Sequence, residues 1–436
     1  MQSVRLKNRP DLTVPACLWL GLFPLLQTGT YSHITLDKWW FMISLTVLTL
    51  IWFIIPLLFS EKADKNMSPV PVFWRTSAFW LGLLLLLWIL LSNLFSPLSL
   101  RVCFLGGTGR REGFLTQFCY LTIFFCFLLS RVQRTPLLLS AGIGLVVFTV
   151  VVLLQRAGGN PLYLYPDGYS YASTPEFQGT IGNVDMVAGY LCLLSGLFLS
   201  SCLSMKRTLV RFNFSLFFFS LTMLALCGFL LVSIHVQFGL LTMGVLIVWA
   251  FLRLLPKRWR VSALLLLLVI FLAVVWFWSD SSGGLWELHE ILHGRLQLSF
   301  GSNRLAVWKY SLGLAGQNWI LGSGSDSFVF RFDDYCRQNS LVVPEFQGDL
   351  QLPVNFDNPH NEYLAQWLNH GFPSMILFLL LILTGMIRKK GGGTYSLAVL
   401  SYAVQAFFSF SVCIVAPMFW VLLGLQNAET ETGFYS

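Results

Sequence analysis

The chain has 436 residues, of which 56% are hydrophobic and only 11% are charged, and its mean hydropathy is +0.70. Soluble domains carry about 25% charged residues, so this composition excludes an ordinary soluble protein. The net charge of +8 would suit a nucleic-acid binder, but the positions of the basic residues, given below, argue for a different role.

Long apolar runs almost without charge predict membrane-spanning helices. Examples are Trp39–Phe59, Ala78–Phe95, Phe114–Ser130 and Ala263–Trp278. About 20 apolar residues in a helix cross a hydrocarbon core of about 30 Å. Lipid cannot bond to backbone groups, and barrel strands of alternating polarity fit none of these runs. We therefore predict an all-α polytopic membrane protein with about twelve transmembrane helices. The expected spans are 12–30, 39–59, 76–96, 113–130, 136–154, 184–203, 213–232, 238–255, 261–279, 372–387, 394–412 and 414–426.

The basic residues predict the orientation of these helices. Positive charge in short loops stays on the cytoplasmic side of a membrane. Most of the 28 Lys and Arg residues lie in the N-terminal segment or in alternate short loops, whereas most acidic residues lie in the other loops. The basic set comprises Arg5, Lys7, Arg9, Lys62, Lys65, Arg75, Arg131, Arg134, Lys206, Arg207, Arg211, Arg253, Lys257, Arg258, Arg260, Arg388, Lys389 and Lys390.

This pattern predicts a multi-pass protein of the cell membrane with a cytoplasmic N-terminus, contacts with membrane lipids and no nucleic-acid partner. The basic start is followed by Pro10, so we expect the first apolar run to be a helix and not a cleaved signal. The predicted organisation has residues 1–278 as helices 1–9 with outer loops at 97–112 and 155–183. Residues 279–371 form a large extracytoplasmic loop, and 372–436 hold helices 10–12 and a short cytoplasmic tail.

Most of the nine cysteines lie in predicted helices, where they read as small packing residues. Cys103 and Cys336 lie in outer loops and are candidates for a disulfide, a pairing that spacing alone does not decide.

The loop at 279–371 is the only extramembrane stretch long enough for a small subdomain. Loops longer than about 15 residues are usually functional or disordered. This loop keeps periodic apolar residues, so we expect it to be partly helical. In Ser302–Leu314, Leu305, Trp308 and Leu312 are expected to share one helical face. A second helix is expected from His360 to Leu368, with Asn358 and Pro359 as its cap and first-turn pair.

The most conspicuous local pattern is His289-Glu290-Ile291-Leu292-His293, which fits H-E-x-x-H. On a helix this spacing places two imidazoles on one face for zinc, with the glutamate as base. No third ligand appears in a recognisable downstream context. We therefore interpret the stretch as an amphipathic interfacial helix and predict no metal site and no cofactor.

Arg304 and His360 are the strongest candidates for chemistry in this loop. A guanidinium binds phosphate bidentately and stays charged, so Arg304 suits an anionic lipid-linked donor; the alternative is a side chain that reaches the lipid headgroups. A neutral imidazole at His360 can take a proton from a hydroxyl, with Asn361 or Glu362 fixing its tautomer. The alternative for His360 is a helix-capping role.

Two glycine-containing stretches are further candidates. Gly322-Ser323-Gly324, with Asp326 and Phe328 behind it, is a weak phosphate cradle and fits better as a turn. Arg110 and Arg111, in GTGRREG, form a second basic spot in an outer loop. They either help to neutralise a diphosphate beside Arg304 or contact lipid headgroups.

Taken together, several stretches resemble the O-antigen ligase family, which also contains Wzy-type O-polysaccharide polymerases. The resemblance covers most of the chain, and its strongest element is the combination R…W…GxGxxxF…HNEYL…G. The stretches are GTGRREGFL (107–115), GTIGNVDMVAGYL (179–191), ELHEILHGRLQLSFGSNRLAVWKYSLGL (287–314), ILGSGSDSF (320–328), FDNPHNEYLAQWLNHGFPSMI (356–376) and SYAVQAFFSFSVCIVAPMFWVLLGL (401–425).

The resemblance implies about twelve helices, a large outer loop between helices 9 and 10, and a metal-independent glycosyltransferase. Such a protein takes glycan from an undecaprenyl-diphosphate carrier and passes it to a lipid or sugar hydroxyl. By this resemblance Arg304, aided by Arg110 and Arg111, contacts the donor diphosphate, and His360 activates the acceptor. Trp308, Asn361 and Glu362 would support them.

One departure from the family pattern stands out. An arginine is expected just after a serine at the turn between helices 7 and 8, but Ser233–Gly239 reads SIHVQFG. Protonated His235 replaces that charge, Arg110 and Arg111 supply it, or this member is inactive. The alternative functions are a non-catalytic membrane protein that binds or moves a lipid-linked glycan and, with less support, a transporter.

Overall fold

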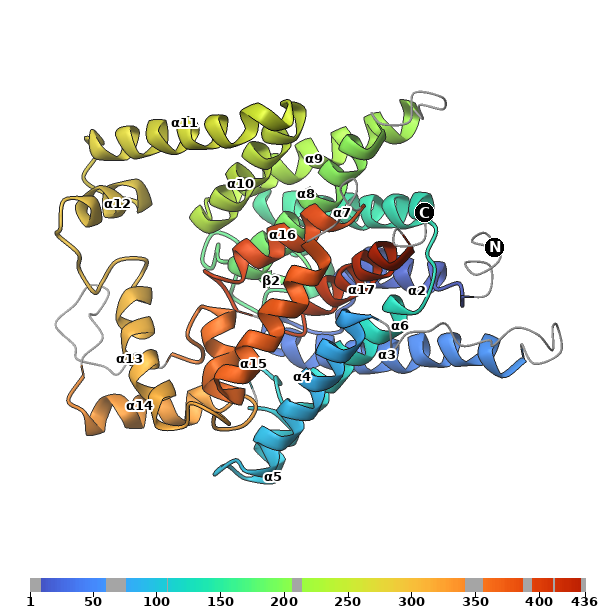
Figure 1. Cartoon of the computed structure of the whole chain (residues 1–436), viewed down its shortest axis with the longest axis horizontal. Helices are drawn as coiled ribbons and strands as arrows, with labels where there is room; N and C mark the ends of the chain where they lie inside the picture. The colour runs from blue at the N-terminus through green and yellow to red at the C-terminus, as the bar shows by residue number, and fades with distance from the viewer. Residues whose placement is uncertain are drawn as a thin grey trace.

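The chain folds into a helical membrane bundle with a cluster of short helices at one end (Figure 1). The computed structural model describes residues 9–59, 76–107, 109–205, 214–341, 356–386, 394–410 and 412–432. Within these residues, eight helices are long and apolar enough to cross a membrane. The chain is therefore an integral membrane protein, as its composition predicts.

The helices of the bundle and the short helices have the following bounds. The N-terminal half holds α2 (Thr13–Cys17), η1 (Leu18–Leu22), η2 (Phe23–Leu25), η3 (Tyr31–His33), α3 (Ile34–Phe59), α4 (Ser77–Leu94), α5 (Leu100–Leu105), α6 (Phe114–Leu128), α7 (Arg134–Arg156), η6 (Pro161–Tyr163), α8 (Val184–Met205) and α9 (Phe214–Ile234). The C-terminal half holds α10 (Gln237–Leu254), α11 (Lys257–Trp276), α12 (Gly284–Leu292), α13 (Arg304–Gln317), α14 (Phe328–Gln338), α15 (Glu362–Met386), α16 (Ser396–Gln405) and α17 (Ala416–Thr432). Two short antiparallel strands, β1 (Phe177–Gln178) and β2 (Gly182–Asn183), pair Gln178 with Gly182.

Burial separates the central helices from those that face lipid. In α8, 89% of the membrane-length stretch is buried, and this helix packs against α9, α10 and α16. In α11 only 6% of the membrane-length stretch is buried, and most of its leucines and valines are exposed. A helix that is apolar on all sides yet exposed fits hydrocarbon and does not fit water.

Each expected span contains a helix, but two spans are more broken than their hydropathy suggests. The first combines α2 with a π-helical turn and a 3₁₀ turn, because Pro24 interrupts regular helix bonding. The carbonyls of Phe23 and Pro24 instead accept hydrogen bonds from the buried ammonium of Lys38, at 2.9 and 2.7 Å. The helix expected over 394–412 ends at Gln405, because the next carbonyl, of Ala406, accepts from the backbone N–H of Glu362 at 2.8 Å.

Several of the basic residues used to predict orientation lie outside the described residues. They are Arg5, Lys7, Lys62, Lys65, Arg75, Lys206, Arg207, Arg211, Arg388, Lys389 and Lys390.

The segment at 279–371 contributes α12, α13 and α14, which lie at the end of the molecule away from both termini (Figure 1). Helices α13 and α14 and the first turns of α15 share a small hydrophobic core of their own. Leu305, Trp308 and Leu312 share one face of α13 as predicted, but Leu312 is 50% exposed, whereas Val307, Tyr310 and Leu314 are buried. These residues are buried because α13 packs on α14 and α15.

A glycine joins this segment to the bundle. Gly371 interrupts α15 with φ +83°, so the first turns of α15 belong to the small core and the rest lies along α4. The carbonyl of Ile320 approaches so closely that a Cβ at position 371 would lie 1.8 Å from its oxygen. The backbone N–H of Phe372 donates to Trp319 at 2.7 Å, which fixes this crossing.

Gly371→Ala is therefore expected to destabilise the protein by at least about 2 kcal/mol, since it adds a strained φ and a backbone clash. Gly316→Ala is the matched control, because Gly316 lies in α13 with no atom within 4 Å of a Cβ and alanine favours helix. Thermal unfolding in detergent measures both variants. Equal unfolding temperatures for the two would contradict the packing described here.

Candidate functional site

The candidate site forms around an aromatic segment, Phe407–Phe410, that follows α16. Phe408 stacks on Phe238 of α10 with ring centroids 4.5 Å apart. Trp308 of α13 meets Phe407 edge-on at 5.4 Å. The segment thus brings together residues from α10, α13 and α16 that are distant in sequence.

Arg304 opens α13 and lies on this aromatic surface. Its guanidinium carbon is 4.6 Å from the ring centroid of Phe238, which is within cation–π range. Nη2 lies 3.4 Å from a carboxylate oxygen of Asp185, and Nη1 donates to the carbonyl of Gly301 at 3.1 Å. Nε is buried and has no hydrogen-bond partner among the described residues. Burial lowers the pKa of Arg304 and Asp185 opposes this shift, but a guanidinium keeps its charge in either case.

His360 lies beside the same aromatic segment. Its ring meets Phe410 edge-on at 5.2 Å, and its backbone has φ +48°. The backbone N–H donates to Asn358 Oδ1 at 2.7 Å, and the preceding carbonyl, of Pro359, accepts from Trp308 Nε1 at 2.9 Å. Trp308 and Asn358 therefore hold the strained backbone that presents the imidazole.

The electrostatic surroundings keep His360 neutral. Burial, followed by the positive charges of Arg304 and Arg110, lowers the pKa of His360 to about 4, while Asp357 opposes this shift. The Nδ1 atom is buried and makes no hydrogen bond within the described part of the chain. Since buried polar atoms normally have a partner, an unpartnered imidazole beside a guanidinium indicates a place where a ligand binds.

Asn361 and Glu362 anchor this segment to the bundle, and neither bonds to the imidazole. Asn361 caps α15 by accepting the backbone N–H of Leu364 at 2.9 Å. Glu362 accepts the hydroxyl of Tyr402 at 2.9 Å. The predicted capping pair of Asn358 and Pro359 was wrong by one turn, because Asn358 binds the backbone of His360 instead.

Arg110 reaches the same place from the loop before α6. Its guanidinium lies 4.8 Å from the ring centroid of Phe410, and its Nε is 3.6 Å from Asp326 Oδ1. Asp326 also accepts the backbone N–H of Gly107 at 2.7 Å. Burial raises the pKa of Asp326, and Arg110 acts against that shift. Arg110 therefore lies on the ring that His360 meets, in the same aromatic segment whose Phe408 stacks on Phe238 beneath Arg304.

The turn that carries Asp326 is fastened to α4 and α15. Gly322 and Gly324 have φ of +69° and +92°, as the interpretation of this stretch as a turn requires. Ser325 bonds to Asn93 of α4 through both its backbone and its hydroxyl, at 3.0 and 2.9 Å. The same hydroxyl lies 2.9 Å from His370 Nε2 in α15. This buried polar network holds the turn in place and thereby positions the Asp326 carboxylate beside Arg110.

Two other candidate residues lie apart from this cluster. The guanidinium of Arg111 lies over Trp39 at 5.6 Å, so it points toward α3. His235 is exposed at the turn between α9 and α10, with φ +55°. Arg156, at the end of α7, reaches that turn instead, with Nη2 3.4 Å from the carbonyl oxygen of Ser233.

The histidine pair of α12 makes local contacts. His289 Nδ1 lies 3.0 Å from the carbonyl oxygen of Val275, and His293 Nδ1 lies 2.8 Å from that of His289. Glu290 binds Arg295 through two hydrogen bonds of 2.7 Å. These contacts fit a helix packed beside the end of α11.

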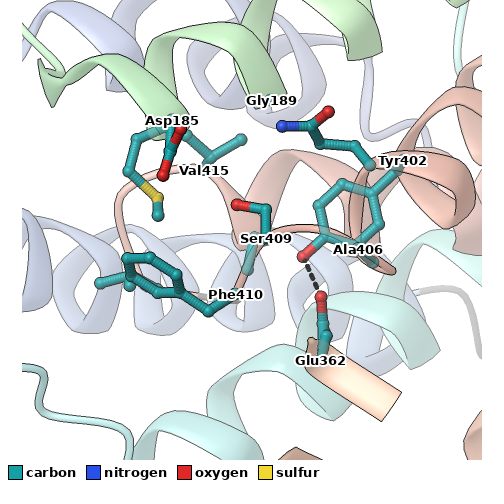
Figure 2. Close-up of a pocket in the computed structure, with 12 residues that line it drawn as sticks. Asp185, Gly189, Glu362, Tyr402, Ala406, Ser409, Phe410 and Val415 are labelled. Atoms are coloured by element: carbon teal, nitrogen blue, oxygen red, sulfur yellow. Dashed lines mark hydrogen bonds between the residues drawn. The ribbon is translucent and has the colours of Figure 1, made fainter. Parts of the chain in front are cut away.

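A small cavity lies beneath the aromatic segment (Figure 2). Asp185, Glu362, Ser409 and Phe410 line it, together with Val412 and Val415 before α17 and Ala416 at its start. Its volume of about 20 Å³ admits one water-sized group. Asp185 therefore connects two features, since it borders this cavity and pairs with Arg304.

The residues that the sequence analysis missed are the partners of the cations. Asp185 and Asp326 were present in the quoted stretches GTIGNVD and GSGSD, but nothing local distinguishes an ion-paired carboxylate from a solvated one. Phe238 and Phe410 resembled ordinary apolar residues of a span. A useful signal was available in Asp185, an acid at the very start of a long apolar run. The two loop cysteines, Cys103 and Cys336, are both buried free thiols.

Part of the chain that carries this site is similar to a known family. No curated protein matches the chain. A family model described as O-antigen ligase matches residues 222–379. The matched region runs from α9 to α15 and includes Arg304, Trp308 and His360, whereas Arg110 and Asp185 lie outside it. Residues 222–379 of the chain are therefore similar to the O-antigen ligase family.

Proposed function

We propose that this protein transfers glycan from an undecaprenyl-diphosphate-linked donor to a hydroxyl acceptor at the site around Phe407–Phe410. One observation carries the proposal: Arg304 Nε and His360 Nδ1 are both buried without a protein partner among the described residues. Both groups border one aromatic segment. A diphosphate oxygen would satisfy the first nitrogen, and an acceptor hydroxyl would satisfy the second.

The donor diphosphate would lie between Arg304 and Arg110. Each guanidinium is held by a carboxylate at 3.4–3.6 Å, longer than a strong charged hydrogen bond. These loose pairs keep the cations in place, and the Nε of Arg304 is left without a hydrogen-bond partner among the described residues. As the sugar leaves the carrier, negative charge grows on the diphosphate, and fixed cations in a site of low polarity stabilise that transition state.

His360 would act as the base toward the acceptor. The hydroxyl oxygen of the acceptor forms a bond to the anomeric carbon of the donor sugar. The bond from that carbon to the diphosphate oxygen breaks, its electron pair leaves with the polyprenyl diphosphate, and the hydroxyl proton passes to His360. The step balances without a metal, a cofactor or a redox partner. The acceptor is a lipid, another sugar or a protein, and each of them presents the same hydroxyl chemistry.

Donor binding would also strengthen the base. The positive charges of Arg304 and Arg110 hold the pKa of His360 down in the free protein. A bound diphosphate carries about two negative charges and offsets those cations. The pKa of His360 then rises toward its ordinary value, which brings it nearer to the range in which a base works well. The base would therefore become effective once the donor is bound.

The topology that goes with this function has twelve spans, a cytoplasmic N-terminus and the site on the outer side. Support comes from the basic residues in the inner short loops and from the position of α12–α14 at one end of the bundle (Figure 1). The resulting organisation has helices at 1–278 and 372–436 on either side of a catalytic segment at 279–371.

Arg304→Ala and His360→Ala are each expected to reduce transfer at least about 100-fold, because one removes transition-state charge stabilisation and the other removes the base. Purified protein with a polyprenyl-diphosphate glycan and a lipid-linked acceptor provides the assay. Arg337→Ala is the control, since this arginine of the same segment is 74% exposed and pairs only locally with Asp334. Unimpaired transfer by both variants would contradict the assigned roles, and absence of turnover by the wild type would favour a non-catalytic glycan-binding protein.

The pH dependence provides a second prediction. Because His360 must be neutral to act as a base and its pKa in the free protein is about 4, kcat/KM should stay constant near neutral pH and fall as the pH drops through about 4. The acidic limb of kcat, which reports the donor complex, should lie at higher pH, since the bound anion raises the pKa of His360.

Rate profiles from pH 3.5 to 8 test this, with unfolding temperatures recorded at each pH to separate titration from denaturation. Arg110→Gln should move the acidic limb of kcat/KM upward, because it removes a cation that disfavours the imidazolium. Coincident limbs for kcat and kcat/KM would argue against coupling between donor and base.

A further inference from the structure

Arg156, the last residue of α7, contacts two loops that lead directly to the partners of Arg304. Its Nη2 donates to Gln178 Oε1 at 2.8 Å and lies 3.4 Å from the carbonyl oxygen of Ser233. The guanidinium also lies over the ring of Tyr171 at 5.7 Å, so three segments meet at one side chain.

The first loop leads to the ion pair. Gln178 belongs to β1, which pairs with β2, and β2 runs straight into α8, where Asp185 lies in the first turn. Asn183 of β2 accepts the backbone N–H of Asp185 at 2.9 Å. A displacement of Gln178 is therefore transmitted through only two paired strands to the carboxylate that binds Arg304.

The second loop leads to the aromatic surface under Arg304. Ser233 lies at the end of α9, and the short turn after it leads into α10 at Gln237. The next residue, Phe238, carries the guanidinium of Arg304 on its ring. His235 in this turn has φ +55°, an unfavourable conformation for a residue other than glycine, so the turn needs support from outside.

We infer that Arg156 is a positioning residue that sets the geometry of Arg304 through these two loops. A planar guanidinium suits this role because it offers donors in several directions from one fixed plane. Arg156 joins α7 to the β1–β2 hairpin and to the α9–α10 turn. Because these two segments lead to Asp185 and Phe238, Arg156 positions both residues around Arg304. The inference rests on the proposed role of Arg304 in donor binding, but the contacts themselves do not.

The test measures the exposure of Arg304 directly, without reference to transfer. Purified Arg156→Gln protein in detergent is treated with phenylglyoxal, which modifies arginine, and the modification of each arginine is followed by mass spectrometry of peptides. Modification of Arg304 should become several-fold faster than in the wild type, because its ion pair and aromatic contact loosen. Exposed Arg337 in the same sample should react at an unchanged rate.

Three further variants make the result specific. Arg156→Lys keeps the positive charge but loses the planar guanidinium with its several N–H donors. The rate at which Arg304 is modified should then lie between those of the wild type and Arg156→Gln. Gln178→Leu removes only the hairpin contact and should give a smaller change in the same direction, which also covers the case in which Arg156→Gln fails to fold. Arg101→Gln, at an exposed arginine of α5, should leave the reactivity of Arg304 unchanged.

Transfer kinetics separate this inference from the proposed function. In an active wild type, Arg156→Gln should raise the donor KM about tenfold, as expected when a binding group is misplaced, and should change kcat less. An unchanged reactivity of Arg304 in both Arg156→Gln and Gln178→Leu would overturn the positioning role. If that reactivity changes while the wild type transfers nothing, the positioning role stands and the proposed function fails.

Discussion

The interaction between Arg304 and Asp185 on the face of Phe238 joins the segment at 279–371 to the membrane bundle. Arg304 begins α13, Asp185 begins α8, and Phe238 begins α10, so three helix starts meet at one guanidinium. Removing a charge from water costs several kcal/mol unless another charge compensates it. The pair therefore has to form for α13 to dock, and its docking in turn brings Trp308 to the carbonyl before His360. The whole site depends on this contact.

The site contains the same electrostatic arrangement twice. Arg304 pairs with Asp185 and Arg110 pairs with Asp326, and each guanidinium also covers an aromatic ring. Burial raises the pKa of nearby Glu112 to about 8, so at neutral pH that carboxyl adds little negative charge. Each of the two guanidinium groups therefore has a carboxylate partner in the free protein. An anionic ligand then meets cations that are already oriented and desolvated, which is the arrangement that favours a developing negative charge.

The sequence predicted the membrane class and most helix positions because hydropathy over about 20 residues is a strong physical signal. It also predicted Arg304 and His360 as candidates, since an arginine in an outer loop suits an anionic donor and the stretch DNPHNEYL resembles the O-antigen ligase family. It did not predict the partners. Asp185 and Phe238 lie 119 and 66 positions from Arg304, and such pairings arise from tertiary packing that no local pattern records. The exposed face of α13 was missed for the same reason, because Leu312 lies opposite the neighbours that α13 acquires in the fold.

The early end of α16 has a consequence for how deeply the site is set. A helix of ten residues is about 15 Å long, roughly half of the hydrocarbon thickness. In the irregular backbone that follows it, Phe408 packs on Phe238 and Phe410 on His360, and non-helical chain at such a depth is tolerated only beside protein or a water-filled cavity. Under the proposed function, a carrier whose lipid tail stays in the bilayer would need to lift its diphosphate only a short way to reach Arg304. Lateral entry from the membrane, and not capture from the aqueous phase, would then set the rate at which donors arrive.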